Sequence, residues 1–146
     1  MKLIAHRGNI NGPNKEKENH PDHINDALKI GYDVEIDIWH VNCKWYLGHD
    51  EPKYEVTDYS FLQKDGLWIH AKNGDAFYKL IQNSNLNSFW HTNEDWILTS
   101  KGYIWTYPNK FLYENSICVL PELGYNGDLK KCHGICSDYI LQYRDL

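Results

Sequence analysis

Short apolar segments of strand length recur along the chain, and polar or turn-forming residues separate them. Segments of this kind, rich in Ile, Val, Leu, Trp and Tyr, are typical of β-strands. Those at 96–99 and 103–107 flank Ser100-Lys101-Gly102 and are expected to pair as a hairpin. With their polar ends, the predicted strand segments cover residues 2–8, 33–39, 44–50, 67–73, 88–91, 96–99, 103–107, 116–120 and 134–138.

Two helices are predicted between these strands, after the first and the fourth of them. Pro21 and Asp22 are typical of a helix start, and Gly31 of a helix end. Residues 75–82 carry Asp75 in the first turn and an apolar stripe behind it. Strands that alternate with helices build a parallel sheet, so the expected fold class is α/β.

One predicted strand, residues 34–38, alternates apolar and acidic side chains with a period of two. This alternation places Glu35 and Asp37 side by side on one face of the strand. Two neighbouring carboxylates repel each other unless a positive charge lies between them, and a hard divalent cation such as Mg²⁺ or Ca²⁺ commonly supplies it. On this segment alone, the solvated polar face of an ordinary strand is the better explanation.

Polar side chains lie at or near the carboxyl ends of four predicted strands, and this recurrence favours a shared site. In a parallel barrel, the carboxyl ends of all strands open at one face. That face would collect two carboxylates, three histidines, an arginine and a lysine. These residues are His6, Arg7, Glu35, Asp37, His49, His70 and Lys72.

Composition narrows the class of protein. The length of 146 residues fits one domain, residues 1–146. The formal net charge is −5 and no basic run occurs, so nucleic-acid binding is not expected. Four unevenly spaced cysteines disfavour a zinc site. Because no apolar run approaches bilayer length and no signal segment precedes the first strand, a cytoplasmic protein without a transmembrane segment is expected, its oligomeric state open.

With these motifs in order, the chain resembles the glycerophosphodiester phosphodiesterase family, part of the phosphatidylinositol phospholipase C-like barrel superfamily. The matching pieces run along nearly the whole chain. The strongest are residues 5–8 (Ala-His-Arg-Gly), 18–19 (Glu-Asn), 31–37 with their Glu-x-Asp, and 48–50 (Gly-His-Asp). Weaker matches are Lys72, residues 103–106 and residues 134–138.

The resemblance implies a (β/α)₈ barrel that hydrolyses a small glycerophosphodiester-like substrate with a bound divalent cation, Mg²⁺ or Ca²⁺. It implies metal ligation by Glu35 and Asp37. Acid–base catalysis would fall to His6 and His49, with a cyclic phosphate as one route. Arg7 and Lys72 would contact phosphate.

Two departures from the family pattern stand out. A barrel of this type typically has about 250 residues, so a reduced (β/α)₈ barrel is expected, with several helices replaced by loops; a partly open barrel is the rival. The family's third metal carboxylate is replaced by His70. Either His70 is the third ligand, although imidazole suits Mg²⁺ and Ca²⁺ less well than carboxylate, or another oxygen completes the shell, with Glu122 as one candidate.

Other interpretations stay open. A phospholipase D-like lyase on lysolipid or sphingolipid head groups would share the same histidines and carboxylates. A barrel without catalysis that binds a phosphorylated ligand is the alternative outside enzymes. Asp50 is interpreted as an orienting or turn residue, and Asp138 as a cap or loop anchor. His91, near a strand end, is a candidate to line the same mouth, although nothing in its neighbours requires it there. His20, His23, His40 and His133 are interpreted as surface residues.

Overall fold

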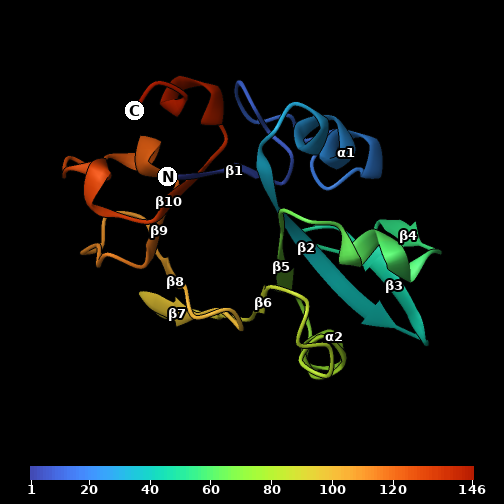
Figure 1. The fold of residues 1–146 in the computed structure, drawn as a ribbon. Helices are drawn as coiled ribbons and strands as arrows, with labels where there is room; N and C mark the ends of the chain where they lie inside the picture. The colour runs from blue at the N-terminus through green and yellow to red at the C-terminus, as the bar shows by residue number, and fades with distance from the viewer.

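A single sheet, curled around an axis, organises the chain in the computed structural model, which describes all residues from Met1 to Leu146 (Figure 1). Seven strands are parallel, in the order β6-β5-β2-β1-β10-β9-β8, and β7 is added antiparallel to β8. The strands are β1 (Lys2–His6), β2 (Asp33–Val41), β3 (Lys44–Leu47), β4 (Tyr54–Val56), β5 (Leu67–Ala71), β6 (Ser88–Phe89), β7 (Trp96–Leu98), β8 (Ile104–Thr106), β9 (Ser116–Val119) and β10 (Gly134–Ser137).

The sheet does not close into a barrel. Its two ends, β6 and β7, share no strand pairing, and they meet through one backbone hydrogen bond from Ser100 N to Ser88 O at 2.8 Å. The prediction of a mixed α/β fold with a mostly parallel sheet is confirmed, but the predicted closed (β/α)₈ barrel is wrong. The reason is local: β6 is only two residues long, and β7 turns back antiparallel on β8.

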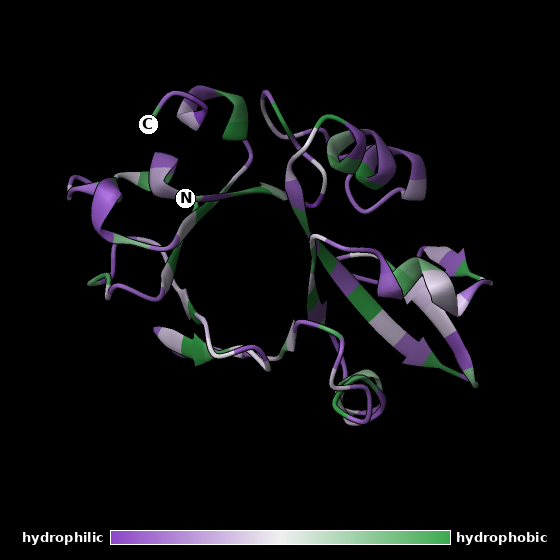
Figure 2. Ribbon diagram, in the orientation of Figure 1, coloured by the Kyte–Doolittle hydropathy of each residue, from purple (hydrophilic) through white to green (hydrophobic).

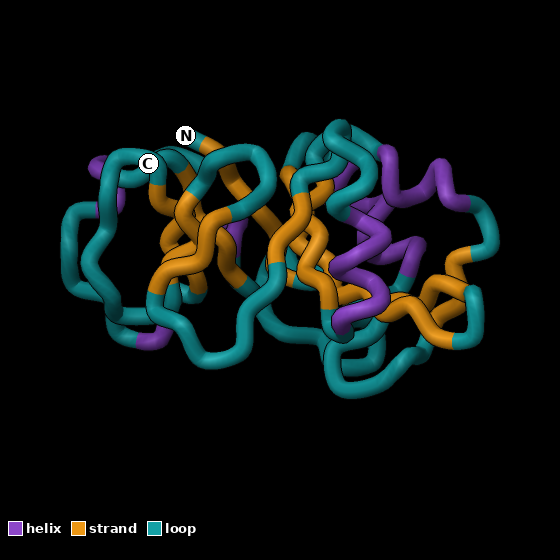
Figure 3. The backbone as a smooth tube through the Cα atoms, turned by 90° about the horizontal axis from the view of Figure 1, so that it is seen from below, coloured by secondary structure: helices purple, strands orange, loops and turns teal.

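Only two α-helices cover the sheet, and they follow the strands that the sequence indicates. α1 (Pro21–Lys29) comes after β1, and α2 (Gly74–Leu80) after β5. The side chain of His20 caps the first helix, and that of Asn73 the second. Both helices lie outside the β2–β5 half of the ring (Figures 1 and 3). Short 3₁₀ helices fill other connections: Tyr59–Gln63, Pro121–Leu123, Leu129–Lys131 and Ile140–Tyr143.

No helix combines the length and the apolar character that crossing a membrane requires.

The interpretation of His40 as a surface residue is wrong, because its side chain is buried under α2. There its Nδ1 bonds to Asp75, and its backbone exchanges hydrogen bonds with the amide of Asn73.

The segment around β3 runs in the opposite direction from the one predicted. β3 forms an antiparallel hairpin with the long strand β2, with Leu47 opposite Ile38. The prediction of a parallel strand at 44–50 is therefore wrong. The returning strand nevertheless ends beside the acidic residues, because Gly48 N donates to Asp37 O at 3.1 Å. His49 reaches the same region as the parallel-strand ends by this route.

The inner side of the curled sheet is apolar toward one end and polar toward the other. Apolar side chains from seven strands form one buried cluster: Ile4, Trp68, Phe89, Ile97, Trp105, Ile117, Val119 and Cys136. His6 follows Ile4 by two residues and His70 follows Trp68 by two, so each histidine continues the same strand face. A larger apolar cluster joins the sheet to both helices, and hydrophobic segments are green in Figure 2. The sheet thus directs polar groups to one end of a packed interior.

Candidate functional site

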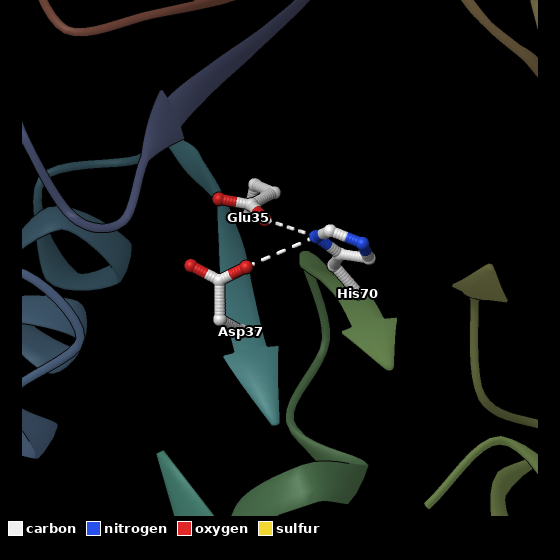
Figure 4. Close-up of side chains that lie close together, drawn as sticks. All are labelled: Glu35, Asp37 and His70. Carbon is white, nitrogen blue, oxygen red and sulfur yellow. Dashed lines mark hydrogen bonds and ion pairs between the residues drawn. The ribbon is translucent and has the colours of Figure 1, made fainter. Parts of the chain in front are cut away.

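The centre of the candidate site is a buried group of two carboxylates and one imidazole. Glu35 and Asp37 project from the same face of β2, and His70 projects from the neighbouring strand β5, where it is paired with Asp37 (Figure 4). His70 Nδ1 lies 3.0 Å from Asp37 Oδ1 and 3.8 Å from Glu35 Oε1. One potential ligand atom from each residue lies within 4.8 Å of the others, so this group could hold a metal ion.

Asp37 is surrounded by donors. Its Oδ2 accepts a hydrogen bond from Asn19 Nδ2 at 2.9 Å, and its backbone N–H donates to Asn19 Oδ1 at 2.9 Å. Lys72 Nζ lies 3.6 Å from Oδ1. Burial alone would raise the pKa of Asp37, but the hydrogen bond from His70 and the charges of Arg7 and Lys72 hold it well below its ordinary value. Asp37 is therefore an ionised, fixed acceptor.

Glu35 is also buried, but fewer hydrogen bonds offset the cost of burying its carboxylate. Its carboxylate accepts one hydrogen bond, from the Arg7 backbone N–H at 3.3 Å, and its side chain is 3% exposed. Burial and the neighbouring charge of Asp37 raise the pKa of Glu35 to about 7. A cation beside Glu35 would offset both causes by stabilising its ionised form, and this is the electrostatic environment in which a bound metal ion stabilises a protein.

His6, at the end of β1, is held by an acidic partner from the far end of the chain. Its Nδ1 donates to Asp138 Oδ1 at 2.8 Å, and Asn9 Nδ2 donates to the same oxygen at 2.8 Å. Burial alone would lower the pKa of His6, but the Asp138 hydrogen bond and the charge of Glu35 raise it. With Nδ1 engaged, Nε2 points toward Glu35, 3.9 Å from Oε2. His6 thus offers Nε2 to the site.

His49 is arranged in a similar way on the other side of the site. It follows β3, and its Nδ1 lies 2.7 Å from Asp50 Oδ1. Its side chain is 38% exposed, compared with 12% for that of His6. Gly48 positions it: the glycine has a φ of +147°, and a Cβ there would lie 2.1 Å from the backbone oxygen of Glu51. Only glycine fits this turn, so its conformation fixes where His49 begins.

Arg7 connects the acidic groups. It adopts a left-handed backbone conformation with φ of +53°, unusual for a residue other than glycine. Its Nη1 donates to Glu18 Oε2 at 3.0 Å. Its Nε lies 3.2 Å from Asp37 Oδ2 at an angle unsuited to a hydrogen bond, so this contact is an ion pair. The strained turn therefore directs the guanidinium toward the carboxylates rather than toward solvent.

A cavity of about 580 Å³ joins these groups. Apolar and aromatic side chains form its opposite wall, among them Trp105, Tyr107 and Leu123. The structure thus brings together every predicted site residue, although their chemical roles stay predictions. The predicted residues that line this cavity are His6, Arg7, Glu35, Asp37, His49, His70 and Lys72.

Several neighbours of the site have contacts that the sequence did not indicate. Asn19 and Glu18 matched a family motif without an assigned role, and they bond to Asp37 and Arg7. Asp138, interpreted as a loop anchor, bonds to His6. The alternative metal ligand Glu122 lies outside the group of three, because its carboxylate accepts hydrogen bonds from Ser137 Oγ and Asp138 N, both at 2.9 Å.

Comparison with models of known families, with curated proteins and with solved structures gives no match for this chain. The geometry and chemistry of the site are therefore the main guide to its function.

Proposed function

We propose that this protein is a metal-dependent phosphodiesterase that acts on a small glycerophosphodiester-like substrate by histidine acid–base catalysis. One observation carries the proposal: two histidines, each with Nδ1 on an aspartate, share a cavity with a buried group that could hold a metal ion. On this proposal, the open sheet of this chain is a reduced form of the (β/α)₈ barrel of the glycerophosphodiester phosphodiesterases.

The charges around the cavity suit an anionic phosphodiester. A divalent cation held by Glu35, Asp37 and His70, Mg²⁺ or Ca²⁺ by the family resemblance, would neutralise a phosphate oxygen and orient phosphorus for attack. Arg7 and Lys72 line the same cavity and would bind the other phosphate oxygens. The ion pairs that Arg7 and Lys72 make with Asp37 keep both side chains at the site before substrate arrives.

The two histidines would move the protons. Each has Nδ1 on a carboxylate, which leaves Nε2 to exchange a proton with the reacting oxygens. One of His6 and His49 would accept a proton from the attacking hydroxyl, and the other would protonate the leaving oxygen. The attacker is either water or a neighbouring hydroxyl of the substrate; the second route gives a cyclic phosphate, as in a lyase.

The test is an assay on bis(p-nitrophenyl) phosphate and on glycerophosphodiesters, with added divalent metal and with chelator. We expect chelator-sensitive hydrolysis that falls at least about 100-fold in both His6→Ala and Glu35→Ala. Glu55→Ala, which removes an exposed carboxylate paired with Lys44, is the matched control and should keep full activity.

Two outcomes would overturn the proposal: activity that survives chelation, or activity undiminished in both variants. Phosphorus NMR of the products separates the hydrolase from the lyase, because a lyase leaves a stable cyclic phosphate.

A further inference from the structure

His70, the third member of the buried group, offers a nitrogen ligand, and the type of ligand influences which metal a site prefers. We propose that Glu35, Asp37 and His70 form a mixed nitrogen–oxygen site that selects a first-row transition ion, of the Mn²⁺ to Zn²⁺ series, over Mg²⁺ and Ca²⁺, with His70 Nδ1 as a direct ligand. The inference rests on the metal site of the proposed function and replaces the cations that the family resemblance implies.

The first argument is where the imidazole points. Nδ1, the ring atom nearest the carboxylates, lies 3.0 Å from Asp37 Oδ1 and 3.8 Å from Glu35 Oε1. Donor atoms about 3 to 4 Å apart can bind one ion at the bond lengths of about 2.0–2.2 Å found for zinc. Figure 4 shows the ring nitrogen directed between the two carboxylates. His70 therefore meets the positional requirement for a ligand without a change of rotamer.

The second argument is that the ring is fixed in this orientation. His91 stacks on His70 with ring centroids 4.4 Å apart and planes 9° apart. Phe89 is also parallel to His70, at 5.1 Å and 4°. Both come from β6 or the residues just after it, beside β5. Such packing preorganises an imidazole ligand, so little rotational freedom is lost when it binds a metal.

The third argument is the shortage of oxygen donors. Ca²⁺ takes about six to eight oxygen ligands, and Mg²⁺, which keeps several waters in its octahedral shell, also takes oxygen rather than nitrogen from the protein. Here Asp37 Oδ2 is bonded to Asn19 and paired with Arg7, and Asp37 Oδ1 lies 3.6 Å from Lys72 Nζ, so few oxygens near His70 are free of other partners. Two carboxylates and one imidazole suit a transition ion, because imidazole is a good ligand for Zn²⁺, Fe²⁺ and their neighbours.

Pulsed EPR on the Mn²⁺-loaded protein tests direct ligation, because a coordinated imidazole gives a ¹⁴N coupling. We expect this coupling in the wild type and in His91→Phe, which keeps an aromatic ring over His70 but has no nitrogen. We expect its loss in His70→Glu, which restores a carboxylate. A wild-type spectrum without the coupling, or a coupling that persists in His70→Glu, would refute ligation by His70. Should His70→Glu fail to fold, His70→Asn takes its place.

Calorimetric titrations with Mn²⁺, Co²⁺, Mg²⁺ and Ca²⁺ test selectivity. We expect the ratio of Co²⁺ to Mg²⁺ affinity to fall at least about tenfold from wild type to His70→Glu, since an oxygen ligand replaces imidazole. An unchanged ratio contradicts the inference. So does a wild-type protein that binds no metal, because His70 would then serve only as a hydrogen-bond donor to Asp37.

These measurements do not depend on turnover, so the two proposals can fail separately. Nitrogen ligation in a protein that cleaves no phosphodiester would keep the metal site and remove the proposed function. Mg²⁺-dependent hydrolysis without nitrogen ligation would keep the function and remove this inference.

Discussion

At the scale of single residues, Glu35 has the strongest consequence for stability. Its pKa of about 7 in the folded protein lies above the ordinary carboxyl value of 4.5. Between these values the folded state keeps a proton that the unfolded state has lost, so this residue makes stability fall as pH rises. Without metal, Glu35→Gln should therefore be more stable than the wild type at pH 8, by up to about 3 kcal/mol.

Chemical denaturation of the metal-free proteins at several pH values measures this difference. The advantage of Glu35→Gln should be small at pH 4.5 and grow toward pH 8. Added metal should reverse the order, because it stabilises only the chain that binds it. A stability difference that does not change with pH would show that the pKa of Glu35 is not raised in the folded protein.

Asp138 is predicted to act as a positioning residue for His6. Asp138→Asn keeps an oxygen that can accept the Nδ1–H of His6 but loses the charge that raises the pKa of that histidine. The limb of the pH–rate profile that reports His6 should therefore move to lower pH. The profile of kcat/KM measures the shift, and an unmoved limb combined with a reduced rate would assign Asp138 a purely structural role.

Sequence patterns predicted some residues of the site and not others, for physical reasons. The alternation at 34–38 was sufficient to place Glu35 and Asp37 on one face, because strand geometry is local. The partnership of His6 with Asp138 joins residues 132 positions apart, and no local pattern specifies it. The same holds for Asn19, whose amide bonds to Asp37 only because the loop after β1 folds across the end of β2.

At the scale of elements, the turn after β3 is predicted to be intolerant of any side chain. In Gly48→Ala, the new Cβ would lie 2.1 Å from the Glu51 backbone oxygen, so the turn that carries His49 must move. We expect a loss of about 2–4 kcal/mol of unfolding free energy and a large loss of phosphodiesterase activity.

Gly102→Ala is the matched control for that substitution. Gly102 also has a positive φ, +83°, but its Cβ would meet no atom within 4 Å. Gly102→Ala should lower the unfolding free energy by about 1–2 kcal/mol through backbone strain alone and leave the phosphodiesterase rate unchanged. Thermal or denaturant unfolding together with the rate assay compares the two. Equal behaviour of the variants would mean that the close contact at Gly48 is unimportant.

The elements that the sequence predicted correctly are those with local signals. Pro21, Asp75 and Gly31 lie at or next to helix ends, which their own preferences favour, and the β7–β8 hairpin is a local turn. The direction of β3 has no such signal, because the same apolar alternation fits a parallel or an antiparallel neighbour. Only the two-residue turn at Asn42 and Cys43, both with positive φ, produces the hairpin with β2.

At the scale of the whole molecule, the open sheet should be visible in hydrogen exchange. β6 and β7 each pair with one neighbour only, whereas β2 lies between β1 and β5 along its amino-terminal half. Backbone amides of β6 and β7 should therefore exchange fastest among the core strands, and those of β1, β2 and β10 slowest. Mass spectrometry or NMR of amide exchange checks this order; equal protection of all strands would indicate a closed barrel in solution.

Closure of the sheet was beyond what the sequence could predict. The chain of 146 residues leaves little length for connections, and that alone is compatible with either a small closed barrel or an open one. The outcome depends on how far β6 extends and on whether β7 pairs with it, and the residues around β6 and β8 contact distant parts of the chain, as Trp68 and Phe89 do with Trp105. Such contacts between distant residues are not encoded in any single segment.

The central claim, that one ion binds between β2 and β5, is tested most directly by anomalous diffraction from crystals soaked in Mn²⁺. We predict a single strong peak within ligand distance of Glu35, Asp37 and His70, absent in crystals of Glu35→Gln. A peak elsewhere on the molecule, or no peak at all, would contradict the account.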